Sequence, residues 1–156
     1  MGTIYYYETD IGKIGITEDN NKITNIFFNG EKIPNGYVLI ESPILKEANT
    51  QLHEYFKGQR KAFDLPIAPV GTEFMISVWD ALRQIPYGQT QSYKAIATVV
   101  GNSRSCRAVG MANNRNPISI VIPCHRVIGS NGNLVGYAGG LNIKEYLLAL
   151  EKNNSI

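Results

Sequence analysis

The spacing of apolar residues in this 156-residue chain changes near residue 70, so different secondary structure is expected before and after that point. Three early segments, residues 3–9, 11–17 and 22–29, are rich in Ile, Tyr, Phe and Thr and are separated by short polar turns. That composition and spacing favour β-strands. Beyond residue 70, apolar residues recur every three or four positions, which is typical of helices. The sequence therefore predicts a β-rich first part and a mostly helical second part.

The first part also contains one expected helix. Ser42 followed by Pro43 is a favoured helix start, because a capping residue precedes proline at the first helical position. Apolar residues then recur at helical spacing from Leu45 to Phe56, and Gly58 ends the run. Together with the three strands, this helix predicts a small α/β domain.

The second part is expected to contain four helices. Three begin after capping residues: Thr72 before a helix from Glu73 to about Ile85, Ser92 before Tyr93–Val100, and Ser103 before a helix from Arg104 to about Asn113. A last helix ends near Glu151, with Asn142 and Glu145 as a start that resembles a capping box. The pair of short helices predicts a helix-turn-helix at about residues 92–113. An ordinary helical hairpin remains the alternative for that pair.

These elements predict two domains. Residues 1–66 form the α/β N-terminal domain and residues 67–156 a mostly α-helical C-terminal domain, with residues 65–70 as the connector. We expect a monomer, because no heptad pattern is visible.

Charge is distributed unevenly between the two parts. Residues 1–70 carry seven basic and nine acidic residues, whereas residues 71–156 carry eight and four. The span from Ala81 to Lys144 has no acidic residue. It contains seven basic residues: Arg83, Lys94, Arg104, Arg107, Arg115, Arg126 and Lys144. Such a surface favours binding to the phosphate backbone of a nucleic acid. The alternative is a mildly basic face that is only solvated.

Several classes of protein are disfavoured. No apolar run approaches the roughly 20 residues of a membrane span, and no signal-like segment opens the chain, so we expect a cytoplasmic protein, nuclear if the cell is eukaryotic. Two cysteines make a disulfide framework implausible. Two cysteines and two histidines without paired spacing make a poor zinc site. We expect no metal and no cofactor.

Cys124 lies between a proline and a His-Arg pair, in the region without carboxylates. A cysteine is nucleophilic as the thiolate, which positive surroundings favour. Cys106, inside an expected helix, is better explained as an inert buried cysteine. If residues 124 and 125 lay on a strand, Cys124 and His125 would point to opposite sides. A turn or a bridging water would then have to connect them.

The segment Asn116–Ile128, which reads NPISIVIPCHRVI, resembles the active-site signature of the 6-O-alkylguanine-DNA alkyltransferases. The resemblance continues through Gly136–Leu141 and Lys144–Glu151. Upstream, it includes Ile85–Gly88, Ser92–Tyr93 and Arg107–Gly110. It is strong over residues 70–152 and only general in residues 1–66, where it implies a ribonuclease-H-like layout.

The resemblance implies a set of catalytic roles. Cys124 would accept the alkyl group, and His125 would deprotonate it through a water. Glu151 would orient and charge-stabilise that histidine. Tyr93 would supply a proton to the departing base, and Asn116 would brace the turn that carries the cysteine.

The resemblance also implies a minor-groove DNA interface and a guanine pocket. Arg107 would fill the space left by the flipped nucleotide. The other expected DNA contacts are Ser92, Tyr93, Arg104, Ser105, Cys106, Ala108, Gly110, Arg115 and Arg126, and the pocket residues are Val127, Tyr137, Ala138 and Gly139. Two positions depart from the family pattern. Ala138 replaces a serine that many members have, and Cys106 is bulkier than the usual alanine.

Each implied role has a simpler alternative when the residue is considered alone. Tyr93 and Tyr137 could be packing aromatics, and Glu151 a solvated residue at a helix end. Arg107 could be one more phosphate contact, and Asn116 a turn residue before proline.

The function implied is repair of DNA by direct reversal. An alkyl group on the 6-oxygen of guanine, or secondarily on the 4-oxygen of thymine, would move once to Cys124 after the base is flipped out of the double strand. Three other functions are less consistent with the sequence. A protein that only binds lesions would lack the acceptor cysteine, a Cys-His hydrolase would bring the two residues together across the fold, and a helix-turn-helix regulator would leave the Pro-Cys-His-Arg block unexplained.

Overall fold

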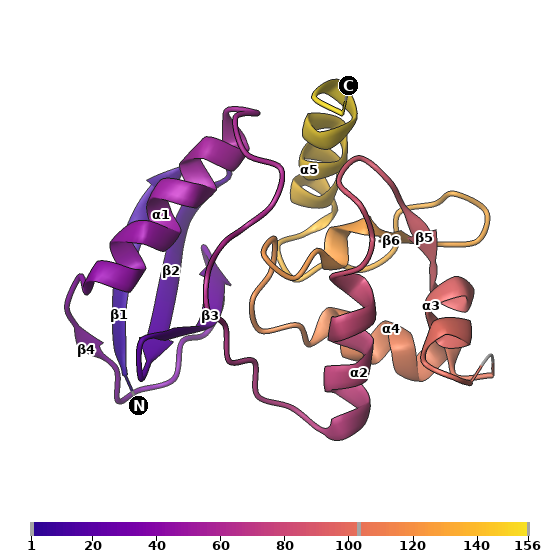
Figure 1. The fold of residues 1–156 in the computed structure, drawn as a ribbon, viewed down its shortest axis with the longest axis horizontal. Helices are drawn as coiled ribbons and strands as arrows, with labels where there is room; N and C mark the ends of the chain where they lie inside the picture. The colour runs from indigo at the N-terminus through magenta and orange to yellow at the C-terminus, as the bar shows by residue number, and fades with distance from the viewer. Residues whose placement is uncertain (1, 103, 156) are drawn as a thin grey trace. The chain divides into compact units, whose positions relative to one another are not determined.

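The computed structural model describes residues 2–102 and 104–155. The chain divides into two compact units, Met1–Val70 and Gly71–Ile156 (Figure 1). No helix in the described ranges is long and apolar enough to cross a bilayer.

The first unit is a four-stranded sheet with one helix. Its strands are β1 (Thr3–Thr9), β2 (Gly12–Asp19), β3 (Lys22–Phe28) and β4 (Val38–Leu39), arranged in the order β3-β2-β1-β4. The first three form an antiparallel meander, and β4 pairs parallel to β1. Helix α1 (Pro43–Phe56) lies across this sheet (Figure 1). The three predicted strands and the predicted helix are confirmed, whereas β4 was not predicted.

The second unit contains four α-helices in its described residues: α2 (Glu73–Leu82), α3 (Tyr93–Val99), α4 (Cys106–Asn114) and α5 (Leu141–Asn153). A single 3₁₀ turn, η1 (Cys124–Arg126), precedes strand β6 (Val127–Ile128), which pairs parallel to β5 (Gln91–Ser92). Helices α3 and α4 form the predicted pair of short helices.

Two predicted helix caps are confirmed. The hydroxyl of Thr72 accepts a hydrogen bond from the Met75 amide at 3.1 Å, and the hydroxyl of Ser92 accepts one from the Ala95 amide at 3.0 Å. Each bond satisfies an amide of the first turn that has no partner within the helix.

The starts of the last two helices differ from the prediction. Helix α4 begins at Cys106 rather than Arg104, and the predicted cap Ser103 lies outside the described residues. Helix α5 begins at Leu141 after Gly140, whose φ of 94° is a conformation that glycine adopts without strain. Asn142 therefore lies inside the helix, and the capping box was predicted wrongly.

The single tryptophan ties helix α2 to helix α4. Trp79 is fully buried, and its indole nitrogen donates to the carbonyl of Ala112 at 2.9 Å. Val78 and Leu82 of α2 and Val109 of α4 are buried as well. This packing holds the second helix of the helix-turn-helix in a fixed position within its unit.

Candidate functional site

Cys124 follows a sharp turn centred on Pro123. The amide of Cys124 donates to the carbonyl of Ile122 at 2.8 Å, and Pro123 has φ −80° and ψ 64°, the geometry of an inverse γ-turn. The proline ring restricts φ to this region and so favours the turn before folding. Cys124 then starts the 3₁₀ turn η1. A turn, rather than a strand, therefore relates Cys124 to His125.

Asn116 spans the loop that leads to this turn. Its side-chain oxygen accepts from the Ile118 amide at 3.0 Å, and its side-chain nitrogen donates to the Ile122 carbonyl at 2.7 Å. Between them, Ile120 is buried with a φ of 76°, a conformation that is rare for a β-branched residue. The Asn116 bonds therefore hold a strained loop closed immediately before Cys124.

The thiol of Cys124 is almost inaccessible, with 3% of the residue exposed. Burial raises its pKa, because a thiolate is poorly solvated in the interior. Hydrogen bonds from the side chains of Asn116 and Ser119 and the positive charge of Lys144 act in the opposite direction without cancelling the effect of burial. At neutral pH the thiol thus needs a neighbouring base to react as the thiolate.

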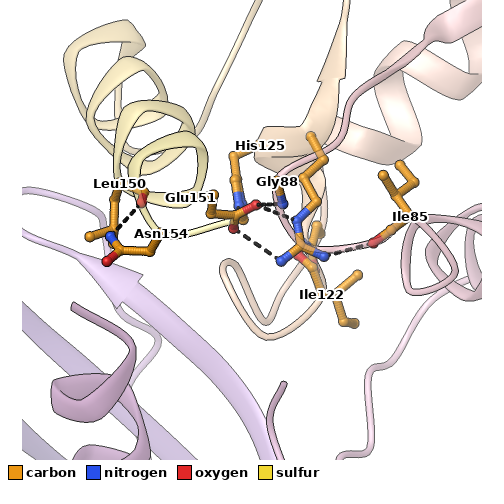
Figure 2. Close-up of polar contacts among 9 residues, drawn as sticks. Ile85, Gly88, Ile122, His125, Leu150, Glu151 and Asn154 are labelled. Carbon is orange, nitrogen blue, oxygen red and sulfur yellow. Dashed lines mark hydrogen bonds and ion pairs between the residues drawn. The ribbon is translucent and has the colours of Figure 1, made fainter. Parts of the chain in front are cut away.

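His125, Arg126 and Glu151 form a buried polar cluster in the residues that follow Cys124 and on α5. Figure 2 shows His125 and Glu151 of this cluster pointing toward one another. The Nε2 atom of His125 lies 2.6 Å from Oε2 of Glu151. Arg126 donates through Nε to Oε1 at 2.8 Å and through Nη2 to Oε2 at 3.0 Å, and its Nη1 donates to the carbonyl of Ile85 at 2.7 Å. The carboxylate of Glu151 thereby fixes the orientation of both side chains.

The cluster sets two protonation states. Burial by itself would raise the pKa of Glu151, but hydrogen bonds and charge from His125 and Arg126 outweigh it and hold that pKa well below its usual range. Burial lowers the pKa of His125, and the opposing effect of Glu151 does not restore it. At neutral pH, Glu151 is ionised and His125 is neutral. Since Nε2 donates to the carboxylate, the neutral imidazole keeps Nδ1 as its basic nitrogen.

Gly88 is a further partner of Glu151 that the sequence analysis did not identify. Its amide donates to Oε1 at 3.1 Å. Gly88 has a φ of 80°, and a Cβ atom at this position would lie 2.6 Å from Cβ of Ser155. Only glycine fits here without strain or displacement. The Ile85–Gly88 segment was part of the family resemblance. Gly88, however, lies 63 residues from Glu151 in the sequence, so the sequence alone did not indicate the contact.

The structure corrects the role expected for Arg126. The resemblance implies that Arg126 is a DNA contact, but the residue is 7% exposed, its guanidinium donates to Glu151 and to the carbonyl of Ile85, and it lies 5.7 Å from the centre of the Tyr87 ring. Its charge is compensated in the interior and is not available to a phosphate. Lys144, the last basic residue of the acid-free span, is also buried.

Tyr93 lies at the N-terminus of α3, half-buried, with its hydroxyl donating to the carbonyl of Val135 at 2.9 Å. Burial raises the pKa of Tyr93, so its hydroxyl stays protonated. The side chain of Asn113, from α4, hydrogen-bonds Tyr93 and also approaches the Cys124 carbonyl, with Nδ2 at 3.4 Å. Asn113 therefore links the second helix of the helix-turn-helix to the cysteine turn, a connection that the sequence did not reveal.

The other predicted DNA contacts lie on or beside α3 and α4. Arg104, Arg107, Ala108 and Arg115 are exposed, and Ser92, Ser105, Cys106 and Gly110 are partly buried. A Cβ at Gly110 would lie 3.9 Å from the Tyr93 ring, so this part of α4 faces Tyr93.

The predicted pocket residues occupy two neighbouring segments. Val127 is buried in β6, next to the cysteine turn. Tyr137 and Gly139 are partly buried and Ala138 is exposed, in the loop between β6 and α5. Among the described residues, no group of three or more His, Cys, Asp or Glu side chains is placed to hold a metal ion.

Comparisons with known proteins identify the same family in both parts of the chain. Two family models match: "6-O-methylguanine DNA methyltransferase, ribonuclease-like domain" over residues 4–69, and "6-O-methylguanine DNA methyltransferase, DNA binding domain" over residues 73–153.

Two curated relatives are named methylated-DNA–protein-cysteine methyltransferase. The protein from Methanosarcina acetivorans is 51% identical over 95% of this chain and 98% of its own length. The constitutive protein from Bacillus subtilis is 45% identical over 93% and 92%. A crystal structure of Mycobacterium tuberculosis OGT in complex with DNA is similar in fold, with a TM-score of 0.92 and 39% identity over 99% of this chain and 94% of that one.

Proposed function

The chain belongs to the 6-O-methylguanine DNA methyltransferase family, and from this premise we propose that Cys124 is the residue that accepts the alkyl group. The chain repairs DNA by direct reversal, with transfer of an alkyl group from DNA to one of its own cysteines. Of its two cysteines, Cys124 has a histidine–carboxylate pair beside it, whereas Cys106 begins a helix. The environment of Cys124 favours it as the acceptor.

His125 removes the thiol proton, through a water, as the thiolate forms. Burial lowers the pKa of His125, so the imidazole is neutral and able to accept a proton at neutral pH. The ionised Glu151 stabilises the imidazolium that results and holds the ring through Nε2. Arg126 keeps Glu151 ionised through their ion pair. Arg126 therefore acts on Cys124 only through Glu151 and His125.

The reaction is a displacement at the alkyl carbon. A bond forms between Sγ of Cys124 and that carbon, and the bond between the carbon and the 6-oxygen of guanine breaks, leaving its electron pair on the base. Guanine is a poor leaving group as an anion, so the hydroxyl of Tyr93 supplies a proton. The product thioether is not hydrolysed, and one molecule therefore repairs one lesion.

DNA binds through the helix-turn-helix, with α4 at the minor groove and Arg107 in the gap left by the flipped base. We assign DNA binding and alkyl transfer to residues 67–156, with residues 1–66 as a separate domain. The protein acts as a monomer in the cytoplasm, mainly on guanine and secondarily on the 4-oxygen of thymine. Val127, Tyr137, Ala138 and Gly139 form the pocket for the base.

The observation that supports this proposal most is the buried thiol of Cys124 beside the His125–Glu151 pair. The test is the intact mass of the protein after reaction with excess duplex that contains 6-O-methylguanine. Repair predicts one added methyl group per chain and no more. An unchanged mass with tight DNA binding would indicate a lesion-binding protein, and would overturn the proposal.

A further inference from the structure

Asn113 carries a buried oxygen atom that lacks a hydrogen-bond donor. The residue lies in the last turn of α4 and is 2% exposed. Among the residues that the structure describes, none donates a hydrogen bond to its Oδ1 atom. A buried acceptor without a donor is costly, and nearly all such groups in proteins are paired. This exception points to a donor that comes from outside the chain.

The nitrogen of the same amide group fixes which way the side chain points. Nδ2 donates to the carbonyl of Cys124 at 3.4 Å. Burial raises the pKa of Tyr93, and a hydrogen bond from Asn113 opposes that rise, as a donor to the phenol oxygen does. If the amide were turned round, Oδ1 would face the oxygens of both partners and be repelled. Oδ1 is therefore the end of the amide that remains available to another molecule.

The reaction brings the damaged base to the two partners of Asn113. The alkyl carbon must reach Sγ of Cys124, and the hydroxyl of Tyr93 must reach the departing base. Gly110, three residues earlier on the same face of α4, also faces the Tyr93 ring, since a Cβ there would lie 3.9 Å from it. A side chain that hydrogen-bonds both Tyr93 and the backbone of Cys124 therefore lies close to the bound base.

The hydrogen-bonding groups of the two damaged bases differ at this point. Methylation of the 6-oxygen removes the proton from N1 of guanine, so that N1, N3 and N7 are all acceptors. The 2-amino group is then the only N–H donor of the base in a nucleotide. In 4-O-methylthymine, methylation removes the proton from N3, and no N–H donor is left. A methylated guanine can therefore supply a partner for Oδ1, and a methylated thymine cannot.

We propose that Asn113 is a specificity-determining residue whose Oδ1 atom accepts a hydrogen bond from the 2-amino group of the flipped guanine. The inference rests on the proposed function, which places the base beside Cys124 and Tyr93. It assigns part of the preference for guanine over thymine to a side chain of α4. A site with a buried acceptor rejects an analogue that lacks the donor, because the acceptor then stays unpaired.

The first experiment uses two free bases that differ only in the amino group, 6-O-methylguanine and 6-O-methylhypoxanthine. Free bases avoid the cost of flipping. The rate of transfer from each base is measured for wild type and for Asn113→Leu, which has a similar size but no acceptor. The ratio of the two rates should be about tenfold larger in wild type, as for one hydrogen bond between neutral groups. Loss of the bond to Tyr93 slows both reactions alike and cancels from the ratio.

Two further variants give the controls. Asn113→Asp retains an acceptor oxygen, so it should keep the preference for 6-O-methylguanine whatever its overall rate. Asn153→Leu removes an exposed asparagine at the end of α5, and it should keep both the rates and the preference of wild type. An unchanged preference in Asn113→Leu would overturn the inference, and so would a preference that is lost in Asn113→Asp.

A structure of a trapped complex avoids the risk that Asn113→Leu fails to fold. Cys124→Ser is crystallised with a duplex that contains 6-O-methylguanine. The 2-amino nitrogen should lie about 2.7–3.2 Å from Oδ1 of Asn113. A water on Oδ1, with the amino group bound elsewhere, would overturn the inference.

The two proposals fail in different ways. If 6-O-methylguanine leaves no methyl group on Cys124 of the wild-type protein, the proposed function is wrong. If Cys124 is methylated but the preference does not depend on Asn113, only the role of Asn113 is wrong.

Discussion

Arg126 binds both carboxylate oxygens of Glu151, with Nε at 2.8 Å from Oε1 and Nη2 at 3.0 Å from Oε2. Bidentate arrangements of this kind are among the strong charge-assisted hydrogen bonds. The same Oε2 atom also lies 2.6 Å from Nε2 of His125. An arginine that the sequence placed at the DNA is therefore part of the interior. It ensures that the carboxylate beside the histidine stays ionised.

Removal of the charge at Glu151 should slow transfer severely. In Glu151→Gln an NH₂ group replaces one carboxylate oxygen, so the side chain can no longer accept from all four of its donors. The orientation of His125 is then lost, and Arg126 remains buried without its counterion. We expect transfer to be about ten- to ten-thousandfold slower and unfolding to be about 3–5 kcal/mol easier. Single-turnover kinetics and urea unfolding, followed by the fluorescence of Trp79, check both. The control is Glu145→Gln, an exposed residue of the same helix, and a Glu151→Gln protein as fast as this control would refute the role of Glu151.

The rate of transfer should depend on pH in a way that identifies the base. The pKa of His125 is lowered and that of Cys124 is raised. If His125 is the base, the rate rises with pH only through the lowered histidine pKa, and is then flat from about pH 6.5 to about pH 8.5. In His125→Gln the thiolate must form without help, so the rate should rise roughly tenfold per pH unit over that range.

The matched control for this profile is the only other histidine. His53 lies on α1, where its Nδ1 is 2.9 Å from the carbonyl of Asn49. His53→Gln should reproduce the flat profile of the wild-type protein. A flat profile in His125→Gln as well would assign the proton transfer to another group.

The salt dependence of DNA binding should reflect five basic residues of the acid-free span rather than seven. Arg83, Lys94, Arg104, Arg107 and Arg115 are exposed, whereas Arg126 and Lys144 are buried. Each phosphate neutralised contributes about −0.9 to the slope of log affinity against log salt, which gives at most about −4.5 for this span. Binding measured from low to moderate salt checks the slope. An affinity that is independent of salt would show that this surface does not bind phosphates.

Loss of Arg107 should affect the double strand and not the chemistry. Flipping a base costs roughly a few kcal/mol only where the base is stacked and paired. We expect Arg107→Ala to repair duplex DNA at least about tenfold more slowly, with the free 6-O-methylguanine base almost unaffected, because even ~2 kcal/mol corresponds to about thirtyfold. Leucine at this position should restore part of the rate, since filling a stack needs volume more than charge.

The control for Arg107 is a second exposed arginine nearby. Arg115→Ala removes the same charge at the C-terminal end of α4, and should weaken binding without a selective loss of repair on duplex DNA. Equal losses in Arg107→Ala on the free base and on the duplex would mean that Arg107 supports the active site instead.

Local signals were sufficient for most of the fold. The β-favouring composition of Thr3–Thr9 and the capping residues Thr72 and Ser92 act within a few positions and are therefore visible in the sequence. Strand β4 gave no such signal: it is two residues long, exposed, and defined only by its pairing with β1.

The composition of the candidate site could be predicted, but the burial of its residues could not. Cys124, His125 and Glu151 stood out by their motifs. Arg126 and Gly88 meet Glu151 across 25 and 63 residues, and no local pattern reports such a contact. Basic residues are mostly exposed, so the sequence favoured a surface position for Arg126. The position of Arg126 in the interior is explained by its ion pair with the buried carboxylate of Glu151.

The most direct test of the account is the position of the transferred group. The protein is reacted with duplex DNA that carries isotopically labelled 6-O-methylguanine, digested, and mapped by mass spectrometry, with Cys124→Ser treated in parallel. The account predicts one label per chain, entirely on Cys124, and none on Cys124→Ser, which should still bind the methylated duplex. A label on Cys106, or repeated turnover with limiting protein, would contradict it.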